Sequence, residues 1–210
     1  MPKYSIIVPA HNSAHFIERC LQSVTEQKYR DFELIVVCDA CTDDTWKIAM
    51  QYADNVIFTN YGNDGPPRQA GVDAARGDWI LFLDDDDWWM HEYTLDIINN
   101  ALGDETGIDI LLFGFIFKTI GYAQPLRKNG GIWPAVWNKC YRRSFINGTP
   151  FHSIVPTPDG NAADIDWTRR IIQLQPRIST LDMPLYYYNY GRSGSQTVEK
   201  VLRKEVGKDD

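Results

Sequence analysis

Four consecutive aspartates follow an apolar segment of the chain. The segment reads ILFLDDDDWW, and its acidic part runs from Asp84 to Asp87. Adjacent carboxylates repel one another, so each raises the pKa of its neighbours and destabilises the fold unless a positive group binds there. The alternative is a solvated turn, but such a turn rarely lies between a core strand and a pair of tryptophans. We therefore expect this run to bind a cation.

Polar side chains also follow two earlier apolar segments. His11 and Asn12 come after the run SIIV and Pro9, and Asp39 comes after the run FELIVV. These runs are typical of buried strands, and apolar residues at helical spacing lie between them. The predicted strands are 5–8, 32–37, 56–58 and 79–83. The predicted helices are 15–27, a helix that begins with capping residues within 42–45 and reaches residue 52, and 66–75.

Continuous apolar strands that alternate with helices predict an α/β fold whose sheet is mostly parallel and covered by helices on both faces. Sheets of this kind bind ligands at the carboxyl ends of their strands. His11, Asp39 and the acidic run all follow strands, so we expect them at one ligand-binding edge. Beyond residue 91 we expect a helix at 93–102, a strand at 108–120, a loop at 121–131, a helix at 164–174 and a strand at 181–190.

The composition indicates a soluble, cytoplasmic protein with one domain. The chain has 210 residues, is 44% hydrophobic and carries a formal net charge of -7, so it has no general attraction to nucleic acid or anionic membrane. Its first residues, MPKYSIIVPAHN, do not form a secretory signal, and no run approaches the length of a membrane span. Peripheral membrane contact and the oligomeric state stay open.

Cys38 and Cys41 form a C-x-x-C pair, which could be a redox pair or half of a zinc site. A zinc site needs two further ligands at suitable spacing, and neither Cys20 nor Cys140 has a second Cys or His arranged to supply them. We therefore expect free thiols in a reducing compartment.

The order of these motifs resembles glycosyltransferase family 2, whose members are inverting enzymes with the GT-A fold. The resemblance spans residues 4–197 and rests on SIIVPAHN, ELIVVCDACTDDT, GPPRQAGVDAARGDWILFLDDDDWW, VWNKCYRRSF, NAADIDW and PLYYYNYGRSGS. It implies a single Rossmann-like GT-A domain with a nucleotide-sugar half at 1–90, an acceptor half at 91–197 and a charged helical tail at 198–210. The chain departs from the family pattern at CDAC, at Gln69 and at Ala163.

The resemblance also implies roles for single residues. The residues it assigns to the nucleotide base are Pro9, His11, Asn12 and Asp39, with Asp39 accepting a hydrogen bond from uracil; those it assigns to the diphosphate and ribose are Arg68, Asp84 and Asp85. Asp86 would be the direct ligand of Mn²⁺ or Mg²⁺, and Asp164 matches the catalytic base. Asp166 is a rival for the base, and a helix N-cap is the alternative for Asp164.

Three further candidates come from the residues themselves. Arg192 lies between two glycines in the loop GRSGS, which is suited to closing over a diphosphate. Trp133 and Trp137 lie in a segment broken by Gly and Pro, so we expect them, with Asp166, near the acceptor sugar.

The predicted activity is transfer of a hexosyl or N-acetylhexosaminyl group from a nucleoside-diphosphate sugar to a hydroxyl of a saccharide or lipid-linked saccharide. The expected donor is a UDP-sugar. The diphosphate needs a divalent ion held by few carboxylates, and the attacking hydroxyl needs a carboxylate base. The alternatives are a phosphotransferase of the haloacid dehalogenase type, a non-catalytic sugar-nucleotide binding module, and a transferase acting on a modified nucleic-acid base, for which Lys139, Arg142 and Arg143 would supply a basic cluster.

Overall fold

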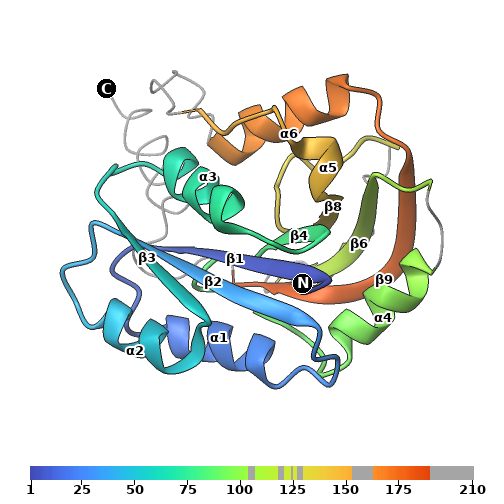
Figure 1. Cartoon of the computed structure of the whole chain (residues 1–210). Coiled ribbons are helices and arrows are strands. Elements are labelled where there is room, and N and C mark those ends of the chain that lie inside the picture. The colour runs from blue at the N-terminus through green and yellow to red at the C-terminus, as the bar shows by residue number, and fades with distance from the viewer. Residues whose placement is uncertain (104–106, 118–120, 124, 127–129, 153–162, 190–210) are drawn as a thin grey trace, which may run out of the picture.

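The computed structural model describes residues 1–103, 107–117, 121–123, 125–126, 130–152 and 163–189. Its centre is a sheet with the strand order β3-β2-β1-β4-β8-β6-β9-β5, in which β7 pairs with β6 (Figure 1). The strands are β1 (Tyr4–Ala10), β2 (Phe32–Asp39), β3 (Asn55–Thr59), β4 (Trp79–Phe82), β5 (Trp88–Trp89), β6 (Ile110–Phe117), β7 (Gly121–Ala123), β8 (Lys139–Arg142) and β9 (Ile178–Tyr188). The helices are α1 (Ile17–Thr25), α2 (Thr45–Tyr52), α3 (Gly65–Ala74), α4 (Thr94–Leu102), α5 (Arg143–Ile146) and α6 (Ala163–Gln173).

The first four strands pair in parallel, and β6 and β9 form a second parallel pair. β1 pairs in parallel with β2 and with β4, and β2 pairs in parallel with β3. Helices α1, α2 and α4 cover one face of the sheet, and α3, α5 and α6 cover the other (Figure 1). The predicted α/β architecture with helices on both faces is therefore confirmed.

The two faces of the sheet bury two separate hydrophobic cores. Alternate side chains of β1 point to opposite faces: Ile6 and Val8 pack in the core beneath α1 and α4, and Ile7 packs in the core beneath α3 and α6. Because both faces are buried, a parallel strand here reads as a continuous apolar run instead of an alternating one. This explains why the strands can be recognised in the sequence.

Three short antiparallel strands were absent from the sequence prediction. β8 pairs antiparallel with β4 and β6, β5 pairs antiparallel with β9, and β7 lies in the segment 121–131 that we expected to be a loop. Each has two to four residues, which is too short to give a periodic pattern. β5 and β8 pair with strands that are distant in sequence, so tertiary contacts decide their structure, whereas β7 pairs with the neighbouring strand β6.

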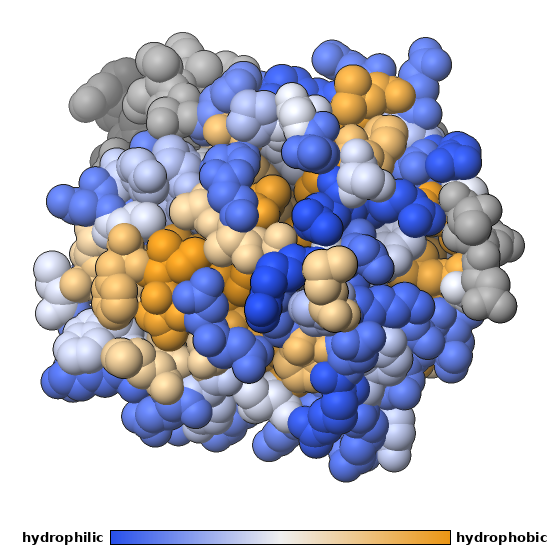
Figure 2. Space-filling view, in the orientation of Figure 1, coloured by the Kyte–Doolittle hydropathy of each residue, from blue (hydrophilic) through white to orange (hydrophobic). Residues whose placement is uncertain are grey.

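The edge strand β3 lies beside α2 and leaves apolar side chains accessible. Phe58 is 61% exposed and Met50 is 60% exposed, and an apolar area lies over this edge of the sheet in Figure 2. Among the described residues, no helix has both the length and the apolar character that crossing a membrane requires.

Candidate active site

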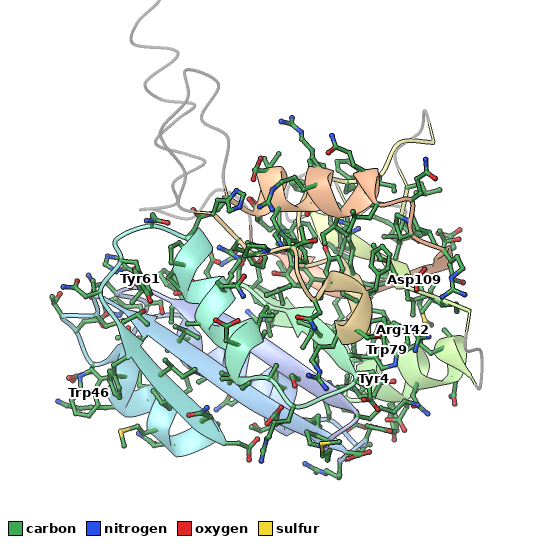
Figure 3. The ribbon with its side chains drawn as sticks, turned by 45° about the horizontal axis from the view of Figure 1, so that its top comes forward. Tyr4, Trp46, Tyr61, Trp79, Asp109 and Arg142 are labelled. Atoms are coloured by element: carbon green, nitrogen blue, oxygen red, sulfur yellow. The ribbon has the colours of Figure 1, made fainter. Side chains whose placement is uncertain are left out.

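The carboxyl ends of β1, β2, β3 and β4 meet at one edge of the sheet. Ala10 pairs with Cys38, and Asp39 pairs with Thr59. The backbone N–H of Leu83, after β4, donates to the carbonyl of Ile7. Figure 3 shows Tyr61, in the loop after β3, at this edge, and Tyr4, Trp79 and Arg142 near the opposite ends of the strands. The polar residues that follow the strands therefore lie along one edge of the sheet, as predicted, and ligand binding there stays a prediction.

The protein itself supplies partners to carboxylates of the acidic run. Arg68 Nη2 donates to Asp84 Oδ1 at 2.8 Å, and the backbone N–H of His11 donates to Asp85 Oδ2 at 3.1 Å. The fourth carboxylate, Asp87, is fully buried and accepts hydrogen bonds from Tyr186 Oη at 2.6 Å and from the backbone of residue 189 at 2.8 Å. The repulsion expected from the sequence is thus relieved in part by protein donors.

Burial dominates the electrostatics of the acidic run. It raises the pKa of Asp84 to about 7, against the opposing effect of the Arg68 guanidinium, and the carboxylates of Asp86 and Asp164 raise it further. Burial also raises the pKa of Asp87 well above its ordinary value. The crowding of carboxylates at a buried position raises these pKa values, and a bound cation would oppose that effect.

Asp86 is half-buried, and its backbone carbonyl accepts a hydrogen bond from Asn189 Nδ2 at 3.3 Å. No group of three or more His, Cys, Asp or Glu side chains is arranged to hold a metal ion within the described ranges. Mg²⁺ and similar ions at phosphate sites use only one or two carboxylates and take their other ligands from phosphate and water. Asp86, with Asp85 beside it, fits an ion that binds together with a diphosphate.

Asp39 holds the loop that follows β3. Its Oδ1 accepts hydrogen bonds from Thr59 Oγ1 and the backbone of Tyr61, at 2.9 and 2.7 Å, and its Oδ2 accepts one from the backbone of Gly62 at 2.8 Å. A carboxylate oxygen has two acceptor positions, so Oδ2 retains one. Sequence reasoning missed Tyr61 and Gly62, because only the fold brings their loop to Asp39.

The first loop is joined to the loop after β2. His11 Nδ1 donates to the carbonyl of Asp39 at 2.6 Å, and Asn12 Oδ1 accepts from the backbone of Thr42 at 2.8 Å. Asn12 has a φ of 48°, a left-handed conformation that Asn tolerates better than most residues. Pro9 is half-buried within β1. The four residues predicted to contact the base thus lie together, and the two loops fix each other.

Asp164 lies in the first turn of α6, inside the helix and not at its N-cap. Its Oδ1 is buried and has no hydrogen-bond partner in the part of the chain that the structure describes. Burial raises the pKa of Asp164; the Arg68 guanidinium opposes this, and the carboxylate of Asp64 adds to it. Asp164 also raises the pKa of Asp84, so α6 brings its carboxylate into the electrostatic field of the strand-end site.

Arg68 is the central cation of the site. It is 6% exposed; its Nη1 donates to the carbonyl of Asp64 at 2.8 Å and lies 3.5 Å from that residue's carboxylate. Its Nε is buried without a hydrogen-bond partner in the described structure. Within the described residues, Arg68 Nε and Asp164 Oδ1 are thus a buried donor and a buried acceptor that a polar ligand could satisfy.

The other candidates differ in their surroundings. Asp166 accepts a hydrogen bond from Arg170 Nε at 2.9 Å, and its side chain is 44% exposed.

Trp133 is half-buried against Phe115. Trp137 is 6% exposed and stacks on Tyr186 at 4.6 Å between ring centroids. Trp137 is therefore packed inside the fold against β9, and the expected place of Trp133, Trp137 and Asp166 near the acceptor sugar stays a prediction. Arg192 and its loop lie outside the described residues.

The basic cluster at β8 is engaged within the fold. Lys139 is fully buried and donates to the carbonyl of Trp133 at 2.7 Å, Arg142 Nε donates to the carbonyl of Ile108, and Arg143 Nε donates to the carbonyl of Gly77. These cations support backbone segments and do not form an exposed basic patch.

Residues 5–166 match the family described as Glycosyl transferase family 2. The chain is 30% identical over 224 residues to the poly(ribitol-phosphate) beta-N-acetylglucosaminyltransferase TarS of Staphylococcus aureus (strain Mu50 / ATCC 700699), a match that covers 98% of this chain and 38% of TarS. The crystal structure of S. aureus TarS 1-349 in complex with UDP-GlcNAc superposes with a TM-score of 0.79 at 28% identity and covers 93% of this chain and 60% of that one.

A more distant structure shares the fold. The mannosyltransferase PcManGT from Pyrobaculum calidifontis, in complex with GDP-Man and Mn2+, has a TM-score of 0.71 at 17% identity, over 96% of this chain and 64% of that chain. The present chain spans 60% of the length of TarS 1-349 and 38% of the length of TarS.

Proposed function

The chain belongs to glycosyl transferase family 2, and we propose that it transfers a sugar from a UDP-sugar to a hydroxyl of a saccharide or lipid-linked saccharide, with inversion at the anomeric carbon. UDP-GlcNAc is the first donor to test, because the TarS structure that resembles this chain contains it. Because TarS is named for a poly(ribitol-phosphate) acceptor, polyol-phosphate polymers belong among the acceptors tested.

The observation that supports this proposal best is the unpaired carboxylate oxygen of Asp164 beside the strand-end site. Inversion requires the acceptor hydroxyl to attack the anomeric carbon from the face opposite the leaving diphosphate. As the new C–O bond forms, the hydroxyl proton must move to a base. Asp164 Oδ1 is a buried acceptor with a raised pKa, which makes it a stronger base than an ordinary aspartate.

Arg68 and the acidic run are proposed to hold the diphosphate. The buried guanidinium of Arg68 has an unused Nε donor, and hydrogen bonds from a cation to phosphate oxygens are among the strong ones. Asp86, with Asp85, would hold a Mn²⁺ or Mg²⁺ ion, which would neutralise charge on the departing diphosphate when bound. Asp84 fixes the position of Arg68 through the 2.8 Å ion pair.

The uracil ring is proposed to bind beside Asp39. The remaining acceptor position on Asp39 Oδ2 suits the N–H of a uracil ring, while Tyr61 and Gly62 keep the carboxylate in place. His11 and Asn12 would line the same pocket. The contacts proposed for the base, the ribose and the diphosphate would thus belong to one donor site in the first half of the chain.

Two alternatives lose support. A phosphotransferase would use Asp84 as a nucleophile, but this carboxylate is paired with Arg68, and the family match indicates glycosyl transfer. A nucleic-acid acceptor would need an exposed basic surface, and Lys139, Arg142 and Arg143 are bonded to backbone carbonyls instead.

The test combines donor binding with turnover. We expect calorimetry to show UDP and UDP-GlcNAc binding that depends on Mn²⁺ and is lost with EDTA, and Asp86→Ala to lose the metal-dependent part. We expect UDP release to rise when a saccharide, lipid-linked or polyol-phosphate acceptor is added. UDP binding without hydrolysis or transfer for any donor would instead identify a non-catalytic binding module, and undiminished UDP affinity in EDTA would exclude the metal.

A further inference from the structure

The thiols of Cys38 and Cys41 meet beside the proposed donor site. Cys38 is at the end of β2 and is 1% exposed, whereas Cys41 is half-buried in the loop that follows. Ala40, between them, has a φ of 50°, a left-handed conformation that reverses the chain. The Cys38 thiol donates a hydrogen bond to Cys41 Sγ, and Cys41 Sγ donates to the carbonyl of Ala10 at 3.4 Å.

The surroundings of the two thiols give them different reactivity. The hydrogen bond from the Cys38 thiol lowers the pKa of Cys41 to about 7, against the effect of burial, and the backbone N–H of Asn12 lowers it further. The same thiol–thiol contact and burial raise the pKa of Cys38. Thiolates, and not thiols, are the reactive form. Cys41 is therefore the accessible nucleophile, and Cys38 is the adjacent thiol that can resolve its oxidation product.

We propose that Cys38 and Cys41 form an oxidation-sensitive pair that closes to a disulfide with hydroperoxides and thereby weakens donor binding. In the first step the Cys41 thiolate attacks the hydroperoxide; an S–O bond forms, the O–O bond breaks, and the leaving oxygen takes up a proton as water or an alcohol. The Cys38 sulfur then attacks the sulfenic sulfur; the S–S bond forms and the S–O bond breaks. The Cys38 proton leaves with that oxygen as water. The two thiols lose two electrons and two hydrogens, and the hydroperoxide accepts the electrons.

Closure changes the donor site because Asp39 lies inside the ring that the disulfide forms. A disulfide brings its sulfur atoms to about 2.0 Å, so Cys41 must leave the carbonyl of Ala10 and the turn must move. The backbone carbonyl of Asp39 is bonded to His11, and its carboxylate holds the loop at Tyr61. This part rests on the proposed function. Losing one hydrogen bond between uracil and a carboxylate corresponds to about tenfold weaker UDP binding.

The other cysteines provide internal controls. Cys20 and Cys140 are fully buried, and burial raises the pKa of both well above the ordinary value. Neither has a second thiol as a contact in the described structure. We therefore expect both to stay reduced under conditions that oxidise Cys41.

The first measurement is intact mass and peptide mapping after brief treatment with hydrogen peroxide. The wild-type protein should lose two hydrogens through a Cys38–Cys41 cross-link, and dithiothreitol should restore them. Cys41→Ser and Cys38→Ala should not form the cross-link, and Cys140→Ala should form it as the wild type does. If Cys38 and Cys41 remain open to alkylation after treatment, the pair is not oxidation-sensitive and the proposal falls.

The second measurement is UDP affinity of the same samples by calorimetry. The Kd of the wild type should rise about tenfold on oxidation and recover on reduction, while that of Cys41→Ser should not change. An unchanged Kd in the cross-linked protein, or an equal rise in Cys41→Ser, would overturn the link to donor binding. A reduced protein that does not bind UDP would refute the proposed donor, and the link with it. Failure to bind UDP is visible before oxidant is added, whereas the mass measurement alone shows whether the disulfide forms. Failure of the proposed function can therefore be distinguished from failure of the redox proposal.

Discussion

Replacing Asp164 with asparagine separates proton transfer from substrate binding. Asparagine keeps the size of the side chain in the first turn of α6, but its amide cannot accept the proton of an attacking hydroxyl. A positioned general base typically contributes about 10² to 10⁴-fold to the rate. We therefore expect kcat for Asp164→Asn to fall by that factor, while UDP affinity changes little because Asp84 and Asp64 still balance the charge of Arg68.

Asp166→Asn is the matched control, because it makes the same chemical change two residues away on the same helix. The Asp166 side chain is 44% exposed and pairs with Arg170 four residues later. Exposed pairs of this kind contribute about 1 kcal/mol or less to stability. The variant should therefore remain folded and keep kcat within about twofold of the wild-type value, a change that lies well below the effect of removing a general base.

The pH dependence of kcat tests the same carboxylate. Burial raises the pKa of Asp164 above its ordinary value of 3.8. The ionised form accepts the proton, so kcat should fall as the pH falls through this raised pKa, and the acid limb should lie at higher pH than an ordinary aspartate would give. The limb should disappear from the residual activity of Asp164→Asn.

The assay is steady-state UDP release with saturating donor and acceptor, together with calorimetry of UDP for each variant. If Asp166→Asn loses turnover while Asp164→Asn keeps it, the assignment of the base is refuted although the family stands. If neither variant loses turnover, the proton goes to a group outside this pair.

Three further changes test other parts of the structure. Asp39→Ala should weaken UDP binding about tenfold by removing a charged acceptor; unchanged affinity in calorimetry would locate the base elsewhere. Tyr186→Phe removes a donor to the buried Asp87 and should lower the free energy of unfolding by about 2 kcal/mol, measured by urea denaturation; equal stability would contradict the hydrogen bond. Burial raises the pKa of Glu33, but hydrogen bonds from Ser5 and Arg76 outweigh it and lower the pKa overall. The ionised Glu33 therefore stabilises the folded state above pH 4.5. This contribution is lost as the pH falls through the lower pKa of the folded state. Glu33→Gln should therefore flatten the acid loss of stability, and an unchanged profile would argue against that role.

The strands β1, β2 and β4 could be predicted from the sequence because they are buried on both faces of the sheet. Segments such as 32–37 read as continuous apolar runs, and the observed strand β2 covers Phe32–Asp39. The short strands β5, β7 and β8 could not be predicted, because two to four residues have no periodicity. The pairing of β5 and β8 also depends on partners far along the chain.

Burial of single side chains likewise depended on the tertiary structure. Trp137 lies in a segment that looks irregular in the sequence, but it packs against Tyr186 of β9. Lys139 reads as part of a basic cluster, yet it is fully buried and bonded to backbone carbonyls. Neither contact has a local signal, since the partners come from other elements.

The sequence by itself determined the family, the fold class and the edge where polar residues gather, because strand ends and acidic runs are local features of the chain. Only the tertiary structure decided how those residues share their charges. In the folded chain Asp84 pairs with Arg68, and the Asp39 carboxylate accepts hydrogen bonds from the loop after β3. Asp164 has a buried oxygen without a partner among the described residues, whereas Asp166 pairs with Arg170. Hydrogen-bond partners and burial depend on which distant elements pack together, and the packing of α3 and α6 against the strand ends is a property of the folded chain.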